Sequence, residues 1–192
     1  MSYRVFIGSS RESIVIAEEI QTNLEASRIP ELEPICWPTI FQLGSYTLES
    51  LLNSLKKSTF GIFVLSPDDY IEIRNESYRI PRDNVILEMG MFIAGVGREN
   101  TFFVYPQNTN EFSFRLPTDL DGVTGAAYAS HIYDNTAQQV YSACVKIKRA
   151  IKEQIEKKKA VAEGVGNKKM PPNVHENGKK LSHRIKEYQK HI

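Results

Sequence analysis

The sequence predicts an α/β protein with a central parallel sheet of about five strands and helices on both faces. Apolar runs of strand length alternate along the chain with segments whose apolar residues recur at helical spacing. The run at residues 60–65 is almost entirely apolar, as in a strand that is covered on both faces. The first run ends in a small polar turn before a helical pattern, which is how a strand–helix unit of a parallel sheet begins.

The first half of the chain supplies two strand–helix units and a third strand. The first strand is expected at residues 3–7, and the apolar positions from 14 to 24 have helical spacing. A less regular strand is expected at residues 32–37, and a helix whose leucines share one face begins at Thr47. The apolar run at residues 60–65 is the third strand.

The second half begins with residues 70–80, which are polar and irregular, as in an active-site flap or a partner-binding loop. A helix is expected from Asp83, and a buried strand at residues 101–106. Residues 126–130 fit a short edge strand, and a long amphipathic helix is expected over residues 136–155. This order predicts a doubly wound sheet of flavodoxin-like size.

Charge divides the chain into two parts. Residues 156–192 hold ten Lys/Arg and four Asp/Glu, a net charge of +6, whereas residues 1–155 hold 14 Lys/Arg and 19 Asp/Glu, a net charge of −5. We therefore expect a domain at residues 1–157 and a basic linker or tail at residues 158–192. The tail either leads toward an absent sensor domain or partner, or is a frayed terminus.

Composition excludes several kinds of site. An acidic body argues against nucleic-acid binding. Cys36 and Cys144 are too few and too scattered for a disulfide framework or a zinc site, so we expect no metal. No stretch approaches the roughly 20 apolar residues of a membrane span, and the start lacks a signal-peptide layout. The expected location is cytoplasmic.

The helix after Asp83 carries an unusual acid. Between Asp83 and Arg98, Glu88 is the one charged residue, so the helix is expected to be buried, with Asp83 capping its first turn. Burying a carboxylate is costly unless it is paired or faces a cleft. Glu88 is therefore either a structural acid paired with Arg82 or Arg98, or part of a functional site.

The turn after the first strand is a candidate phosphate site. Gly8 allows close backbone approach, and the exposed amides of a helix start attract anions. Ser9 and Glu12 have the spacing of a helix capping box. Ser10 completes the turn. The chain has no glycine-rich dinucleotide fingerprint and no P-loop.

Other candidates are expected at the same edge of the sheet. Ligands of such sheets bind at the carboxyl ends of the strands, where the turn at Gly8, the loop at Trp37, the loop at Asp68 and the start of the Glu88 helix should meet. Trp37 and Phe41 are either core or lid residues, or a pair that stacks on a flat heterocycle.

Five short motifs together resemble a known family. They are residues 5–10 (Val-Phe-Ile-Gly-Ser-Ser), 37–41, 66–69 (Ser-Pro-Asp-Asp), 81–92 (with Arg-Asp-Asn-x-x-x-Glu-x-Gly-x-Phe) and 116–120 (Leu-Pro-Thr-Asp-Leu). In this order they resemble the bacterial TIR-like effector domains of cyclic-nucleotide-triggered anti-phage defence (CBASS and Pycsar), which are fused to STING or to cyclic-nucleotide-binding modules. The resemblance covers about residues 3–155.

The resemblance implies a TIR fold and an NADase, a hydrolase that cleaves NAD⁺ to nicotinamide and an ADP-ribose product when a sensor oligomerises it. It implies that Glu88 is the catalytic residue, that NAD⁺ is a substrate with no further cofactor, and that TIR domains associate to build composite sites. On this hypothesis the Gly8 turn holds phosphate, the aromatic loop stacks on a base, and the residues before Glu88 orient it or the ribose. The substrate-binding candidates are Gly8, Ser9, Ser10, Trp37, Phe41, Asp68, Arg82, Asp83 and Asn84.

Two other functions fit the same residues. A nucleoside deoxyribosyltransferase-like enzyme shares the fold type and a glutamate at the ligand edge, and it would exchange bases between deoxyriboses. A non-catalytic TIR scaffold would act by self-association and would not need Glu88.

Overall fold

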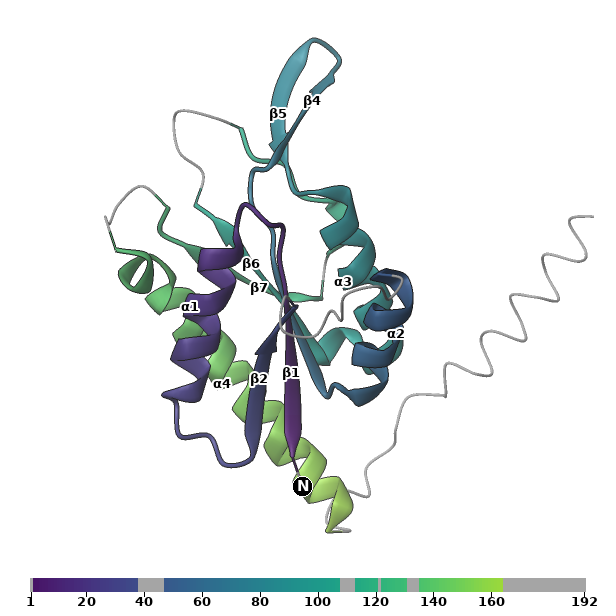
Figure 1. The fold of residues 1–192 in the computed structure, drawn as a ribbon, viewed down its shortest axis with the longest axis vertical. Helices are drawn as coiled ribbons and strands as arrows, with labels where there is room; N and C mark the ends of the chain where they lie inside the picture. The colour runs from purple at the N-terminus through teal and green to yellow at the C-terminus, as the bar shows by residue number, and fades with distance from the viewer. Residues whose placement is uncertain (1, 38–46, 108–112, 121, 131–134, 164–192) are drawn as a thin grey trace, which may run out of the picture. The chain divides into compact units, whose positions relative to one another are not determined.

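Five strands form the central sheet of the computed structural model (Figure 1), in the order β2-β1-β3-β6-β7. The strands are β1 (Tyr3–Gly8), β2 (Leu32–Cys36), β3 (Phe60–Val64), β6 (Thr101–Pro106) and β7 (Thr124–Tyr128). Every neighbouring pair is parallel, so all the carboxyl ends lie at one edge. The expected parallel sheet of about five strands is confirmed, and the short strand expected at residues 126–130 is β7, at the sheet edge.

The structure describes residues 2–37, 47–107, 113–120, 122–130 and 135–163. Contacts divide the chain into a body, Met1–Ile155, and a second unit, Glu156–Ile192. Residues 158–162, expected to begin the linker, are helical, and the expected tail beyond residue 163 lies outside the described residues. Within the described ranges, no helix combines the length and the apolar character that a membrane span requires.

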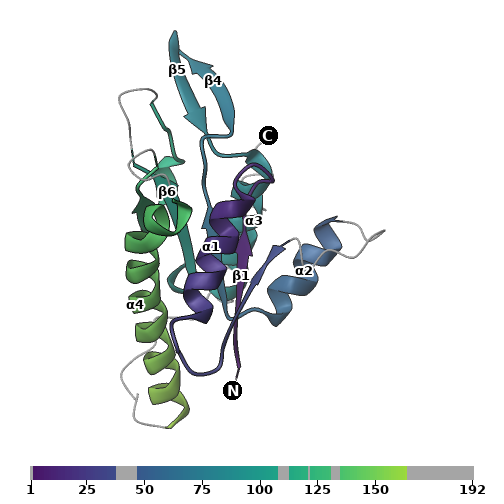
Figure 2. The ribbon, with the colours of Figure 1, turned by 60° about the vertical axis from the view of Figure 1, so that its left-hand side comes forward.

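Helices cover both faces of the sheet, as the sequence predicts. The helices are α1 (Ile14–Glu25), α2 (Thr47–Lys57), α3 (Asp83–Val96) and α4 (Thr136–Ala162), and the short 3₁₀ turns are η2 (Arg98–Asn100) and η3 (Thr118–Leu120). Figures 1 and 2 show α1 and α4 on one side of the sheet and α2 and α3 on the other. Two separate apolar cores result, one on each face.

The core under α1 and α4 is largely aliphatic and contains both cysteines. Ile20 of α1 and Ile147 of α4 are fully buried against strand residues such as Ile62. Cys36 and Cys144 are also buried there and form no disulfide. Burial raises the pKa of each thiol to about 12.

The core under α2 and α3 is aromatic. Phe92 of α3 stacks on Phe6 with ring centroids 4.8 Å apart and meets Phe63 edge-on at 5.2 Å. Gly61 lets Phe92 approach the sheet, because a Cβ at Gly61 would lie 2.6 Å from Cδ1 of that ring. A Cβ at Gly8 would likewise lie 2.9 Å from the ring of Phe63. Gly61 therefore sets how closely α3 packs on β3, and Gly8 makes room for the ring of Phe63.

Residues 70–80, expected to be irregular, instead form most of an antiparallel hairpin. Its strands are β4 (Asp69–Ile73) and β5 (Glu76–Ile80), and it projects beyond the carboxyl edge of the sheet (Figure 1). Arg74 and Asn75 form a two-residue turn with φ of 52° and 65°, the geometry that matches the strand twist. This turn does not contain the Asn-Gly or Asp-Gly pair that usually marks such a geometry.

Helix α3 differs from its expectation in two ways. Its N-cap is Arg82, while the Asp83 carboxylate accepts a hydrogen bond from the adjacent amide of Asn84 at 2.7 Å. The helix is also not buried all round, since the Leu87 side chain is 59% exposed and Gly90 faces open space. The helix ends at Gly97, whose φ of 94° is a backbone conformation that favours glycine.

The capping box expected at Ser9 and Glu12 does not form. Helix α1 begins at Ile14 after Ser13, which makes no side-chain cap. Both predicted capping residues make contacts with distant parts of the chain instead. Trp37 donates a hydrogen bond to Ser9, and Arg82 donates one to Glu12.

Two glycines test the packing of α3. Gly61→Ala should destabilise the protein by about 1–3 kcal/mol, because Phe92 is held between two other rings and cannot yield to the new methyl group. The control is Gly90→Ala on the exposed side of α3. This substitution should stabilise the protein by up to about 1 kcal/mol, because alanine has a higher helix propensity than glycine. Urea unfolding measures both, and equal stabilities of the two variants would contradict this account of the packing.

Candidate functional site

Glu88 lies on the second turn of α3, near the carboxyl edge of the sheet. Its side chain is half-buried. Val85, one turn before it, and Phe92, one turn after it, are buried in the aromatic core and lie on the same side of the helix. The carboxyl group therefore borders an apolar wall.

Burial raises the pKa of the Glu88 carboxyl from 4.5 to about 7. Among the described residues, no ion pair or hydrogen bond joins it to another side chain. The structural-acid alternative named two arginines, and neither pairs with it. Arg82 pairs with other carboxylates, and Arg98 follows the opposite end of α3, beside Gly122. Near neutral pH Glu88 can therefore both carry a charge and exchange a proton.

Arg82 connects three segments at the carboxyl edge. Its Nη2 donates a hydrogen bond to Oε1 of Glu12 at 3.0 Å, in the segment after β1. Its Nε lies 3.2 Å from Oδ2 of Asp69, at the start of β4, as an ion pair without hydrogen-bond geometry. Asp69 and Glu12 raise the pKa of Arg82. The guanidinium is therefore engaged with two acids.

Asp68 lies beside this arginine in a chain of buried serines. Ser13 donates a hydrogen bond to Oδ1 of Asp68 at 3.4 Å, and the hydroxyls of Ser10 and Ser13 are 2.7 Å apart. Burial raises the pKa of the Asp68 carboxyl. Its Oδ2 is buried without a hydrogen-bond partner among the described residues. Ser13 thus links Ser10, in the turn after β1, to Asp68, in the segment after β3.

The turn after β1 also meets the end of β2. Nε1 of Trp37 donates a hydrogen bond to Oγ of Ser9 at 3.0 Å, and Trp37 is half-buried against the aromatic core. Ser9 and Ser10 are each 6% exposed, so both hydroxyls are used within the protein. Phe41, the other aromatic candidate, lies outside the described residues.

Asp83 and Asn84 are exposed on the first turn of α3. The Asp83 carboxylate is used by the neighbouring amide. Among the described residues, no hydrogen bond joins either side chain to Glu88. Their assignment to the substrate stays a prediction.

Most of the candidates lie at one edge, as the sequence predicts. Ser9 meets Trp37, and Ser10 is linked to Asp68 through Ser13. Gly8 has a packing role against the Phe63 ring. Sequence reasoning missed the connecting residues, which are Glu12, Ser13 and Asp69. The local signal at Glu12 indicated a helix cap, and nothing local pointed to its partner 70 residues away.

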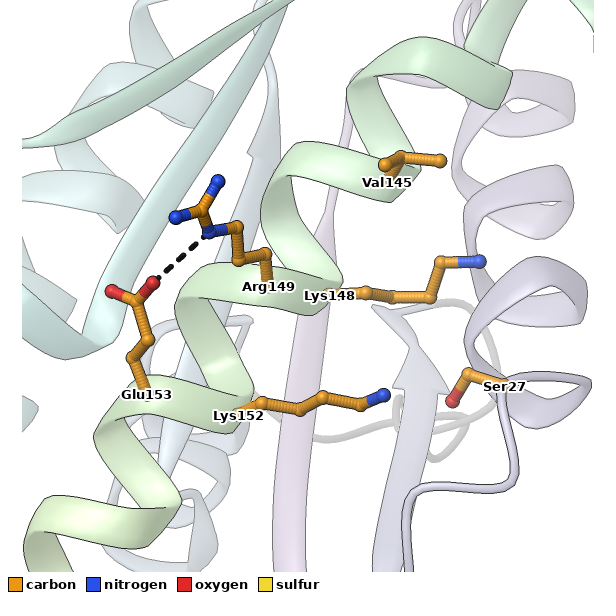
Figure 3. A pocket seen from close by; sticks show the side chains of 6 residues that line it. All are labelled: Ser27, Val145, Lys148, Arg149, Lys152 and Glu153. Carbon is orange, nitrogen blue, oxygen red and sulfur yellow. Dashed lines mark hydrogen bonds and ion pairs between the residues drawn. The ribbon is translucent and has the colours of Figure 1, made fainter.

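Two cavities lie away from Glu88. One of about 410 Å³ lies between α4 and the turn after α1 (Figure 3). It is lined by Ser27, Val145, Lys148, Arg149, Lys152 and Glu153. Another of about 340 Å³ is lined by Phe103, Tyr105, Leu116, Pro117, Thr118, Leu120, Gly122, Val123 and Gly125. None of the described residues that line these two cavities is a candidate site residue. Nowhere in the described ranges do three His, Cys, Asp or Glu side chains gather as metal ligands.

Comparison with known proteins gives a consistent result. A family model described as the TIR domain of CAP12/Pycsar effector proteins matches residues 4–130. The chain is 36% identical over 128 residues to CD-NTase-associated protein 12 of Sphingobacterium faecium, covering 67% of this chain and 37% of that protein. It is 37% identical over 127 residues to the Pycsar effector protein PaPycTIR of Pseudomonas aeruginosa, covering 66% of this chain and 40% of that protein.

A further relative extends the match. The chain is 32% identical over 161 residues to CD-NTase-associated protein 12 of a Lachnospiraceae bacterium, covering 81% of this chain and 48% of that protein. In all three comparisons the match spans less than half the length of the relative.

The burial of Glu88 predicts a pH-dependent stability. Because its pKa is raised in the folded state, the folded protein holds this proton more tightly than the unfolded chain, and stability falls as pH rises from about 4.5 to 7. Glu88→Gln removes this cost. The variant should therefore be more stable than wild type by about 1–3 kcal/mol at pH 8.5, with a smaller difference at pH 5. Urea unfolding at the two pH values measures this, and an unchanged difference would contradict it.

Proposed function

The chain belongs to the family of TIR domains of CAP12/Pycsar effector proteins, and from this premise we propose that it is an NAD⁺ glycohydrolase effector of anti-phage defence. The observation that carries the proposal is Glu88. It is a half-buried acid beside an apolar wall, with its pKa raised to about 7 and with no cationic partner among the described residues.

The proposed reaction breaks the bond between nicotinamide and the ribose of NAD⁺. The bonding electron pair leaves with the nicotinamide nitrogen, whose positive charge is thereby neutralised, so no general acid is needed. An oxocarbenium-like cation develops on the ribose, and a nearby carboxylate stabilises it. Water then adds to the anomeric carbon and loses a proton, for which Glu88 is a suitable acceptor near neutral pH. The products are nicotinamide and ADP-ribose.

Self-association is the proposed trigger. The names of the relatives refer to CD-NTases and to Pycsar, and each relative has sequence beyond the match. We propose that a cyclic-nucleotide sensor, on this chain or on a partner, brings copies together. The exposed side of α3 next to Glu88 carries no charge after Asp83: Leu87 is 59% exposed, and Gly90 and Ala94 are also exposed. Such a face suits another uncharged protein surface.

The catalytic role is tested by NAD⁺ loss at high protein concentration or under forced clustering. Glu88→Gln and Glu88→Ala should lower the rate at least about 100-fold, because the developing cation loses its carboxylate. Glu18→Gln on the exposed part of α1 is the matched control and should retain the wild-type rate. Equal NAD⁺ loss in wild type and both Glu88 variants would remove Glu88 from the mechanism.

This experiment also separates the alternatives. A scaffold would lose no function in a phage-protection assay when Glu88 is replaced by Gln. A deoxyribosyltransferase-like enzyme would exchange bases between deoxynucleosides and leave NAD⁺ intact.

The α3 face is tested by Leu87→Glu. The substitution should reduce NAD⁺ loss about tenfold or more at high protein concentration, because a charge on this face opposes apolar contact between copies. Thermal stability should change little, since Leu87 is exposed. Val145→Glu, an exposed position of α4 on the other side of the sheet, is the control. Unchanged activity of Leu87→Glu across a concentration series would contradict this role.

A further inference from the structure

The start of α3 is held by ionic contacts that come from other segments. Arg82 is the N-cap residue, and its carbonyl accepts the first helical hydrogen bonds, from the amides of Val85 at 3.1 Å and Ile86 at 3.3 Å. The same residue's side chain contacts Glu12 after β1 and Asp69 after β3. One residue therefore begins the helix that carries Glu88 and ties it to two neighbouring segments.

The charge around Arg82 is already balanced. The guanidinium has two carboxylates within 3.2 Å, and the nearby Asp68 also raises its pKa. An incoming phosphate would have to displace one of these acids or enter a field that repels it. Arg82 is thus poorly suited to bind the phosphates of a dinucleotide.

We propose that Arg82 is a positioning residue, which fixes the start of α3 through Glu12 and Asp69 and thereby sets where Glu88 stands. This inference rests on the proposed function, since Glu88 is placed for the cleavage of NAD⁺. The sequence left two roles open for Arg82, orienting Glu88 or orienting the ribose, and the contacts with Glu12 and Asp69 favour the first. Its partners Glu12 and Asp69 take part in the same positioning role through their ion pairs with Arg82.

A second link ties the same two segments. The hydrogen bond between Ser13 and Asp68 joins the segment after β1 to the segment after β3, and Ser10 supports it. The serine link fixes the two segments to each other, and the Arg82 contacts fix α3 to both. The helix is then held at its start by these contacts and further along by Phe92 in the aromatic core.

The ionic contacts position the helix and add little stability. Arg82, Glu12 and Asp69 have side chains that are 37%, 54% and 39% exposed, and ion pairs at such exposure contribute little to folding. Displacement of a catalytic group by about 1 Å, in contrast, can slow a reaction about 100-fold. The structure therefore predicts variants that fold normally and react slowly.

The test is a double-mutant cycle on the full chain. Arg82→Gln should lower kcat for NAD⁺ cleavage about 10–100-fold and change KM less than about threefold. Glu12→Gln with Asp69→Asn should have a similar effect. Adding Arg82→Gln to that pair should cost no further activity, because its anchors are already gone. A rise in KM, a further tenfold loss in the triple variant, or an unchanged kcat for Arg82→Gln would overturn the proposal.

A second measurement does not depend on catalysis. Hydrogen exchange at the amides of Val85–Leu87 should be several-fold faster in Arg82→Gln and in the Glu12/Asp69 pair variant than in wild type. Arg4→Gln, which removes an ion pair to Glu33 in the parallel β1–β2 pair, is the control and should leave both kcat and this exchange unchanged. If wild type does not cleave NAD⁺, the proposed function fails while exchange still tests the anchoring. Unchanged exchange in both variants would overturn the proposal.

Discussion

The burial of the Glu88 carboxyl without a counter-charge among the described residues is the constraint on which the candidate site depends. Burial disfavours the charged form, which is why the pKa rises to about 7. The free energy that offsets the cost of burying this carboxyl must come from the packing around Glu88. Phe92 on the same helix provides part of it by stacking on Phe6 and meeting Phe63 edge-on. A site that holds an acid in this state lowers the stability of its own fold, as functional sites often do.

The two faces of the sheet have separate tasks. The aliphatic core under α1 and α4 contains none of the candidate residues. The aromatic core under α2 and α3 supports the helix that carries Glu88 and also contacts Trp37. Small residues on the strands, with Gly61 as the clearest case, allow α3 to approach the sheet closely. The position of Glu88 is therefore fixed by the aromatic packing of α3 on the sheet and by the contacts of Arg82 at the carboxyl edge.

The parts of the fold that depend on local pattern could be predicted from the sequence. Apolar runs located the parallel strands of the central sheet. The hairpin at residues 69–80 was missed, because its turn uses Arg74 and Asn75 rather than a glycine. Glu88 stood out because it is the one charge in an apolar segment. That Arg82 pairs with Glu12 and Asp69 instead of Glu88 could not be predicted, since it depends on where the Arg82 side chain points.

The contacts between distant segments could not be predicted. Glu12 and Arg82 are 70 positions apart, and Ser13 and Asp68 are 55 apart. A single sequence carries no pattern for such pairs. The spacing of Ser9 and Glu12 fits a helix cap equally well, and the cap was the wrong interpretation. Because segments that follow parallel strands meet at the carboxyl edge, these residues could be placed in one region, but the sequence does not say which of them are in contact.

The state of the two cysteines has a practical consequence. Cys36 and Cys144 lie in the aliphatic core, and with each thiol pKa near 12 the reactive thiolate is almost absent at neutral pH. The two native thiols should therefore react very slowly with maleimides. A single cysteine placed at the exposed turn of the β4–β5 hairpin would accept a fluorophore selectively, and energy transfer between labelled copies would then follow their assembly in real time without removal of the natural thiols.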